Sequence, residues 1–112
     1  MGAGVKGVRK FRNRPVEVDG VRYDSKKEAA RSQQLALLQR AGEISDLQRQ
    51  VRFPMVVNGD LACTYVADFT YRTADGALVV EDVKSPPTRS QPAYRIKAKL
   101  LKALHGLQVS EV

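Results

Sequence analysis

The chain contains one cysteine, one histidine and no tryptophan in 112 residues. A single cysteine, Cys63, excludes a disulfide within the chain, and one cysteine with one histidine cannot supply the four ligands of a structural zinc site. We therefore expect a reducing, cytoplasmic setting. No apolar run approaches the roughly 20 residues that cross a bilayer, and no apolar segment follows the basic N-terminal residues as a secretory signal requires. We expect no membrane partner.

Acidic residues are scarce relative to basic ones. Lys and Arg number 19 against 12 Asp and Glu, which gives a formal net charge of +7 and a pI of about 9.9. Such a surplus predicts a polyanionic partner, with nucleic acid as the first candidate. The length of 112 residues and the hydrophobic content of 43% predict one folded domain with a substantial core.

The first 15 residues differ in composition from the rest. They are basic, rich in glycine and free of acidic residues, and we expect a flexible basic arm before a folded domain at 16–112. A solubilising tail is the alternative. Basic side chains of this arm and of the last predicted helix are expected to contact DNA phosphates, although those of the helix could simply form its solvated face. They are Lys6, Arg9, Lys10, Arg12, Arg14, Arg95, Lys99 and Lys102.

A hairpin and a helix are predicted first in the domain. Asp19-Gly20 lies between alternating residues and predicts a two-residue turn joining short strands over 16–23. Ser25 and Glu28 have the spacing of a capping box, and the apolar stripe behind them predicts a helix over 26–41.

The next segment has β patterning. Strands are predicted over 51–57, 61–72 and 77–84, and Pro54 makes the first of them an edge strand. Asn58-Gly59 predicts the turn between the first two.

The C-terminal segment completes the predicted fold. Three prolines in residues 85–92 predict a loop, and an amphipathic pattern predicts a helix over 93–105 that ends before Gly106. A last strand is expected within 107–112. The order ββ-α-β-β-β-α-β predicts an α/β or α+β domain in which helices flank a central mixed sheet.

Several residues receive structural interpretations. Glu81 is expected to pair with an arginine of a neighbouring strand or to be solvated. His105 lies in the last turn of the predicted helix, where a histidine interacts favourably with the helix macrodipole. Alternation predicts one core face along the middle strand, with its cysteine as a small buried thiol rather than a nucleophile. That face comprises Cys63, Tyr65, Ala67, Phe69 and Tyr71.

The turn at Gly76 decides which residues of the last hairpin oppose each other. The loop Ala74-Asp75-Gly76 predicts a three-residue turn with glycine at positive φ. This register places Asp68 opposite Asp82, and period-two alternation brings Lys84 to the same face. Two carboxylates about 4 Å apart repel by about 4 kcal/mol at an effective dielectric near 20. A hard cation such as Mg²⁺, with Mn²⁺ as a substitute, suits paired aspartates and predicts metal-assisted phosphodiester cleavage.

These residues resemble the PD-(D/E)XK nuclease superfamily. Asp68, followed on the adjacent strand by Asp82-Val83-Lys84 and preceded by a helix bearing Glu28, has that superfamily's arrangement. The segments VDGVRYDSKKEA, AGEISDL, TYVADFTY, VVEDVKS and IKAKLLKALHG resemble small phage endonuclease-like proteins assigned to it. The resemblance implies a restriction-endonuclease-like core and a Mg²⁺-dependent DNA endonuclease, similar to Holliday junction resolvases and end-cleaving transposase subunits. It also implies a phage protein in the host cytoplasm.

The resemblance assigns roles residue by residue. Asp68 would be the acid of the first motif, Asp82 and Lys84 the acid and lysine of the second, and the Val83 carbonyl a backbone ligand. Glu28 would complete the metal shell, but a capping glutamate belongs at the same position, so both roles remain open. Ala67 precedes the first acid where the superfamily's name has proline. Further candidates at the rim are Gln50, Lys97 and Lys99.

The sequence therefore predicts a Mg²⁺-dependent endonuclease acting on branched or otherwise structured DNA in phage recombination or replication, as a homodimer. Asp24-Ser25-Lys26 also fits acid-x-Lys, but it lies at a helix start without an opposed acid. Two alternatives remain: a non-catalytic DNA-binding module with a nuclease-like fold, and a nuclease subunit that cuts only within a larger complex.

Overall fold

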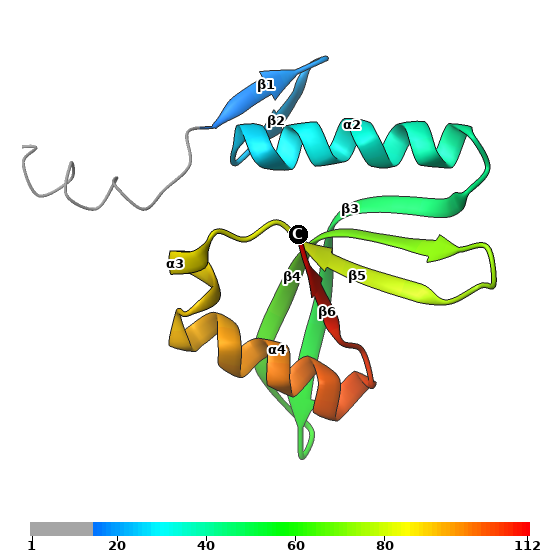
Figure 1. The fold of residues 1–112 in the computed structure, drawn as a ribbon. Helices are drawn as coiled ribbons and strands as arrows, with labels where there is room; N and C mark the ends of the chain where they lie inside the picture. The colour runs from blue at the N-terminus through cyan, green and yellow to red at the C-terminus, as the bar shows by residue number, and fades with distance from the viewer. Residues whose placement is uncertain (1–14) are drawn as a thin grey trace, which may run out of the picture.

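The structure, a computed structural model, describes residues 15–112 (Figure 1). The predicted arm lies almost wholly outside them, including its proposed DNA contacts Lys6, Arg9, Lys10, Arg12 and Arg14. None of the helices in the described part of the chain combines the length and apolar character that a bilayer span requires.

The domain is α/β, with a four-stranded mixed sheet and a separate two-stranded hairpin. The sheet order is β3-β4-β5-β6, in which only the β5–β6 pair is parallel. The β1–β2 hairpin lies beside helix α2 (Figure 1). The elements are β1 (Val16–Val18), β2 (Val21–Tyr23), α2 (Lys26–Arg40), β3 (Ile44–Val57), β4 (Asp60–Thr73), β5 (Leu78–Asp82), α3 (Pro86–Arg89), α4 (Pro92–His105) and β6 (Val109–Glu111).

The predicted element order is confirmed except within residues 85–92, which are not wholly a loop. The short helix α3 begins at Pro86. Proline is tolerated in a first helical turn because its missing N–H would have no partner inside the helix and its fixed φ suits the turn. Prolines therefore mark the start of both α3 and α4.

The two longer helices begin and end within one residue of the predicted bounds. The Ser25 hydroxyl accepts a hydrogen bond of 3.1 Å from the Glu28 N–H at the start of α2. Gly106 ends α4 at a φ of 68°, where a side chain would be strained.

The β4–β5 hairpin has the predicted register. Gly76 adopts a φ of 88° in the turn, and the Thr73 N–H donates to the Ala77 carbonyl at 3.0 Å. Tyr71 pairs with Val79. The three-residue turn thus fixes which residues of the two strands oppose each other.

Strand β3 is longer than the sequence predicted. It lies at the sheet edge as expected from Pro54, but it begins at Ile44. Asp46 and Gln50, with φ values of 56° and 52°, interrupt its extended backbone. These left-handed residues break the alternation from which a strand is predicted, so the first half of β3 was missed.

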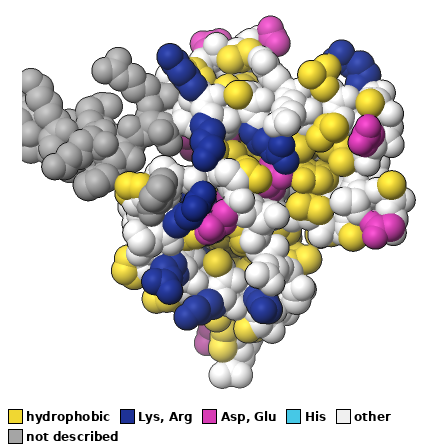
Figure 2. Space-filling model, viewed as in Figure 1, with side chains coloured by type: hydrophobic (Ala, Val, Ile, Leu, Met, Phe, Trp, Pro, Cys, Tyr) yellow, Lys and Arg dark blue, Asp and Glu magenta, His cyan; other side chains and the backbone are white. Residues whose placement is uncertain are grey.

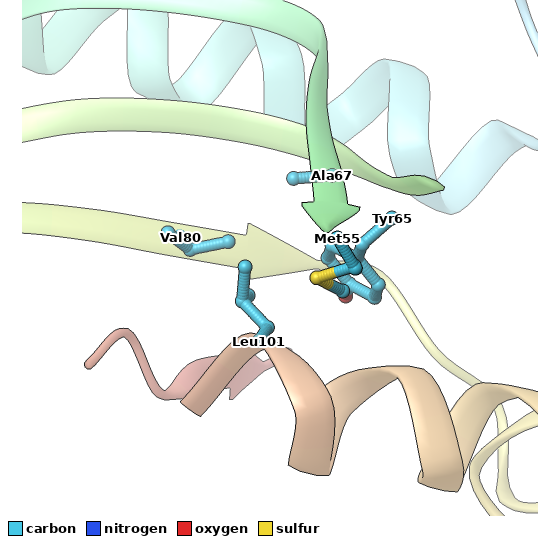
Figure 3. Close-up of a cluster of buried hydrophobic side chains, with 5 residues drawn as sticks. All are labelled: Met55, Tyr65, Ala67, Val80 and Leu101. Carbon is cyan, nitrogen blue, oxygen red and sulfur yellow. The ribbon is translucent and has the colours of Figure 1, made fainter. Parts of the chain in front are cut away.

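The residues predicted to face the core along β4 are buried except Cys63, but they form two clusters instead of one. Tyr65 and Ala67 pack with Val80 in a cluster that Leu101 of α4 covers (Figure 3). Phe69 and Tyr71 instead pack with Leu35 of α2 and with Val79. Cys63 is half-buried beside the first of these clusters.

Neighbouring residues of a strand point to opposite faces, and Val79 and Val80 therefore show that the two clusters lie on opposite faces of the sheet. Strand β4 changes its core-facing side between Ala67 and Phe69, at Asp68. Gln50 lies at the same level of β3, since its neighbours pair with Ala67 and Phe69. In Figure 1 both long strands bend midway along their length. The bend gives α2 and α4 separate halves of the sheet to cover.

Candidate active site

Asp68 and Asp82 meet where the alternation of β4 breaks. The Asp68 N–H donates to Asp82 Oδ1 at 2.8 Å, and the Val83 N–H donates to Asp68 Oδ2 at 2.9 Å. Each carboxylate is therefore held by the backbone of the other strand. The pairing of Phe69 with Glu81, continued by one residue, sets Asp68 opposite Asp82. The structure thus brings the two predicted acids together.

The Asp82 carboxylate is buried and incompletely neutralised. Its residue is 1% exposed, and Oδ2 accepts a hydrogen bond from the Tyr65 hydroxyl. Lys84 Nζ lies 3.9 Å from the same oxygen. Burial raises the pKa of Asp82 to about 6, against the opposing effects of Lys84 and of the Asp68 N–H. The nearby Glu111 adds a further increase.

Asp68 has a related environment. Burial raises the pKa of its carboxyl, which the Val83 N–H, Lys84 and a hydrogen bond from the Gln50 side chain oppose. For both aspartates, burial raises the pKa by more than the neighbouring donors and Lys84 lower it.

Glu28 is buried at the start of α2, 3% exposed, and both its oxygens have partners. Oε1 accepts a hydrogen bond of 3.1 Å from the Asp24 N–H, and Oε2 accepts one of 3.1 Å from Gln50 Nε2. The Nη2 atom of Arg49 lies 3.6 Å from Glu28 Oε2. Burial, followed by repulsion from Asp68, raises the pKa of Glu28. Glu28 thus binds backbone at the helix start and also lies within the electrostatic field of the aspartate pair.

Gln50 connects Glu28 to the aspartates. Its amide donates to Glu28 Oε2. A hydrogen bond from the same side chain to Asp68 lowers the pKa of that carboxyl. Its φ of 52° belongs to the region that residues other than glycine rarely adopt. In the sequence, Gln50 is only a polar residue before a predicted strand. Its place at the rim of the site could be suggested from that, but its backbone conformation and its two partners could not.

Lys84 lies two residues beyond the end of β5 and is held from several sides. Its N–H donates to the Val112 carbonyl at 3.2 Å, and its own carbonyl accepts from Lys27 Nζ at 3.2 Å. The ammonium lies 4.7 Å from the centre of the Tyr94 ring. These contacts fix the side chain next to Asp82.

Tyr65 and Tyr94 were missed by sequence reasoning. Tyr65 was assigned to the core stripe, although its hydroxyl binds Asp82. Tyr94 donates to Glu111 Oε2 at 2.6 Å while its ring faces Lys84. The only sequence signal was a phenolic hydroxyl in an otherwise apolar pattern, and buried tyrosines need a partner for that group.

The donor set fits a hard divalent cation. Oxygen ligands from Asp68, Asp82 and the Val83 carbonyl are the kind that Mg²⁺ prefers, and Mg²⁺ commonly takes one or two carboxylates and keeps several waters. Within residues 15–112 there is no group of three or more His, Cys, Asp or Glu side chains arranged to hold a metal. Any carboxylate ligands would therefore come from the aspartate pair, to which Glu28 is linked through Gln50.

Glu81 is buried, and the prediction that its partner would come from a neighbouring strand is wrong. Arg31 of helix α2 binds both its carboxylate oxygens, at 2.7 and 2.8 Å, and the Tyr71 hydroxyl donates to it at 2.8 Å. Helical Arg31 reaches the sheet because α2 covers this half of it.

The remaining candidates lie on α4. His105 is in its last turn, as expected, and its Nε2 lies 3.0 Å from the Pro54 carbonyl oxygen. Arg95, Lys99 and Lys102 are exposed. Figure 2 shows basic side chains gathered on one face from the start of α2 across to α4.

Comparison with protein families gives one match. Residues 8–109 match the family described as Protein of unknown function (DUF1064). No curated protein and no solved structure matches the chain.

Proposed function

The chain belongs to the DUF1064 family, and we propose that it is a Mg²⁺-dependent DNA endonuclease with a restriction-endonuclease-like core. One observation carries the proposal: Asp68 and Asp82 are each anchored by the other strand's backbone, with Lys84 3.9 Å from Asp82. Paired acids with an adjacent lysine, held on strands, are suited to metal-assisted hydrolysis of a phosphodiester.

Each residue has a distinct role in the proposed reaction. Asp68, Asp82 and the Val83 carbonyl hold the metal, and Glu28 orients the site through Gln50 or joins the metal shell. A bound magnesium ion supplies polarisation of the scissile phosphate and stabilisation of the leaving oxygen. The Lys84 ammonium holds the attacking water beside the phosphate. Tyr65 keeps the Asp82 carboxylate oriented by donating to Oδ2.

The electrostatics support a cation at this position. The pKa of Asp82 is raised to about 6, mainly by burial, and that of Asp68 is raised for the same reason. A divalent cation would neutralise both carboxylates and release any proton they hold. Metal affinity is then expected to increase with pH up to about neutrality.

The substrate is proposed to be DNA of branched or otherwise structured form. The formal net charge of +7 and the basic side chains from the start of α2 across to α4 (Figure 2) suit a phosphate backbone. A symmetric junction needs a cut in each of two strands, so a twofold dimer is part of the proposal.

The test is a cleavage panel of four-way junctions, flaps, linear duplex and single strands with Mg²⁺ or Mn²⁺. We expect cleavage of at least one substrate, lost in Asp68→Ala and Asp82→Ala. Glu43→Ala, which removes an exposed acid, is the matched control and should cleave normally. Absence of cleavage with every substrate, or full activity of Asp82→Ala, would contradict the proposal.

A second candidate is a non-catalytic DNA-binding module. The exposed basic side chains of α4, Arg95, Lys99 and Lys102, favour it, because they can bind DNA phosphates whether or not a metal is held. Calorimetry with Mn²⁺ separates the two candidates, because the nuclease should take up metal at a site lost in Asp68→Ala. The binding module should show salt-sensitive DNA affinity without that uptake. Metal uptake without cleavage would instead point to a subunit of a larger nuclease.

A further inference from the structure

A pocket adjoins the aspartate pair on the α4 side of the sheet. It has a volume of about 260 Å³ and lies between β4, the segment after β5 and the start of α4. Asp82 and Lys84 line it, so it is continuous with the candidate active site, and Lys97 of α4 lines its other side. Neither the family description nor the proposed metal chemistry gives this pocket a role.

Among the residues described, Lys97 has no partner for its charge. The residue is half-buried, and no hydrogen bond or ion pair to its ammonium group occurs in that part of the chain. The pocket's other ammonium group, on Lys84, already contacts Asp82 at 3.9 Å and the Tyr94 ring at 4.7 Å. Two lysines lining one small pocket repel each other. Their arrangement becomes favourable when an anion lies between them.

Asp82 does not serve as that anion. Its Oδ1 accepts from the Asp68 N–H, and its Oδ2 accepts from the Tyr65 hydroxyl and faces Lys84. It is the only acidic residue that lines the pocket among the residues described. Thr64 also lines the pocket and offers a hydroxyl donor. Two ammonium groups and a hydroxyl are a donor set for phosphate oxygens.

We propose that this pocket binds a phosphate of the DNA strand next to the scissile one, with Lys97 as its main ligand. This inference rests on the proposed nuclease function, because a strand whose reacting phosphate meets Asp68 and Asp82 carries its neighbouring phosphate beside them. Lys97 then positions the strand and takes no part in proton transfer. Holding the backbone on both sides of the reacting bond fixes its orientation.

The proposal is tested by binding in EDTA, which prevents cleavage and so does not depend on the nuclease activity. Fluorescence anisotropy with labelled duplex and four-way junction would compare wild type with Lys97→Ala and Lys97→Arg across salt concentrations. We expect Lys97→Ala to weaken binding about tenfold and to reduce the salt slope by about one. Lys97→Arg, which keeps the charge, should recover most of the affinity.

Arg40→Ala is the matched control, because it removes one exposed positive charge from the far end of α2. It should bind DNA as wild type does. Equal binding by Lys97→Ala and Arg40→Ala would overturn the proposal. If Lys97→Ala binds weakly while the wild type cleaves no substrate, the pocket stands and the nuclease function fails.

The source of the phosphate is tested with two probes. NMR titration of the metal-free protein would use inorganic phosphate in one arm and a short single-stranded oligonucleotide in the other. We expect the oligonucleotide to shift signals around Lys97 and Thr64 at much lower concentration than phosphate does. Equal affinity for the two probes would overturn a DNA-strand site.

Discussion

Glu81 and Asp82 are neighbours on β5 and equally buried, each 1% exposed, yet they lie in opposite electrostatic surroundings. Glu81 faces α2 and receives a two-pronged ion pair from Arg31 together with the Tyr71 hydroxyl. Asp82 faces the other side, and among the residues described its one ion-pair partner is Lys84, at 3.9 Å. One strand therefore carries, side by side, an acid bound by a bidentate arginine and an acid whose single ion pair is longer.

The difference separates a structural acid from one available for chemistry. A buried carboxylate with a bidentate arginine has its charge and its hydrogen-bonding capacity used within the fold. A buried carboxylate with a raised pKa has free energy to gain from a further cation. Burial alone would not have distinguished the two residues. Their partners do, and the partners come from different helices and strands.

The largest expected effect is on catalysis. Asp82→Asn should reduce DNA cleavage about a thousandfold or more, since a lost metal contact removes several kcal/mol of transition-state stabilisation. Glu81→Gln should keep most activity in the fraction that remains folded. Single-turnover rates with folded fractions measured by circular dichroism check this. Equal losses in the two variants would remove the distinction between these acids.

The next effect is on folding. Arg31→Ala leaves Glu81 buried without its cation and should lower the free energy of unfolding by about 3 kcal/mol. The measurement is urea denaturation, with Arg40→Ala on the same helix as the exposed control, for which we expect a change within about 0.5 kcal/mol. If the free energy of unfolding of Arg31→Ala is within about 0.5 kcal/mol of the wild-type value, the ion pair is not needed to keep Glu81 buried.

A third prediction concerns pH. The pKa of Asp82, about 6 in the folded protein, lies above its ordinary value of 3.8. Between these values the folded state binds the additional proton, so the contribution of Asp82 to stability falls as pH rises through that window. In EDTA, Asp82→Asn should exceed the wild type in stability by about 3 kcal/mol above pH 6, with the difference disappearing below about pH 4.

Thermal denaturation across pH measures this difference, and Glu81→Gln provides the contrast because it should be less stable than wild type at neutral pH. Added Mn²⁺ should stabilise the wild type and not Asp82→Asn. A difference between wild type and Asp82→Asn that does not vary with pH would contradict the raised pKa.

The smallest effect concerns Gln50. Glycine adopts its φ of 52° without strain, so Gln50→Gly should change stability by no more than about 1 kcal/mol, with relief of strain offsetting the lost bond to Glu28. Cleavage should nevertheless decrease, because the link between Glu28 and Asp68 is broken. Gln50→Ala, which loses the amide and keeps the strain, should be less stable than Gln50→Gly. The opposite order would show that the backbone at this position is not strained.

The hairpin register could be predicted because it depends on local chemistry. The turn residues around Gly76 set the register of the hairpin, and this register places Asp68 opposite Asp82. The capping of α2 at Ser25 and the end of α4 at Gly106 depend equally on nearby backbone groups. Such features need no knowledge of tertiary packing.

The features that failed depend on distant contacts. The buried residues of β4 are divided between two clusters because the sheet bends at Gln50 and Asp68. A prediction from period-two alternation assumes a regular strand and cannot locate such a bend. The partner of Glu81 is Arg31, 50 residues away. The Tyr65 hydrogen bond to Asp82 likewise depends on how the sheet curves. Sequence reasoning therefore identified the acids and missed most of the groups that set their properties.

The anchoring of Asp68 and Asp82 by each other's backbone also bears on the order of folding. The two bonds span only 14 and 15 residues of sequence and lie within a single hairpin. Hairpins close within microseconds, well before distant elements dock. The acidic pair can thus assemble before either helix arrives, and its mutual repulsion then opposes closure of the hairpin. If the pair binds a divalent cation as proposed, such ions in the refolding buffer should accelerate this step, and the cation would then affect the rate of folding as well as the stability of the folded state.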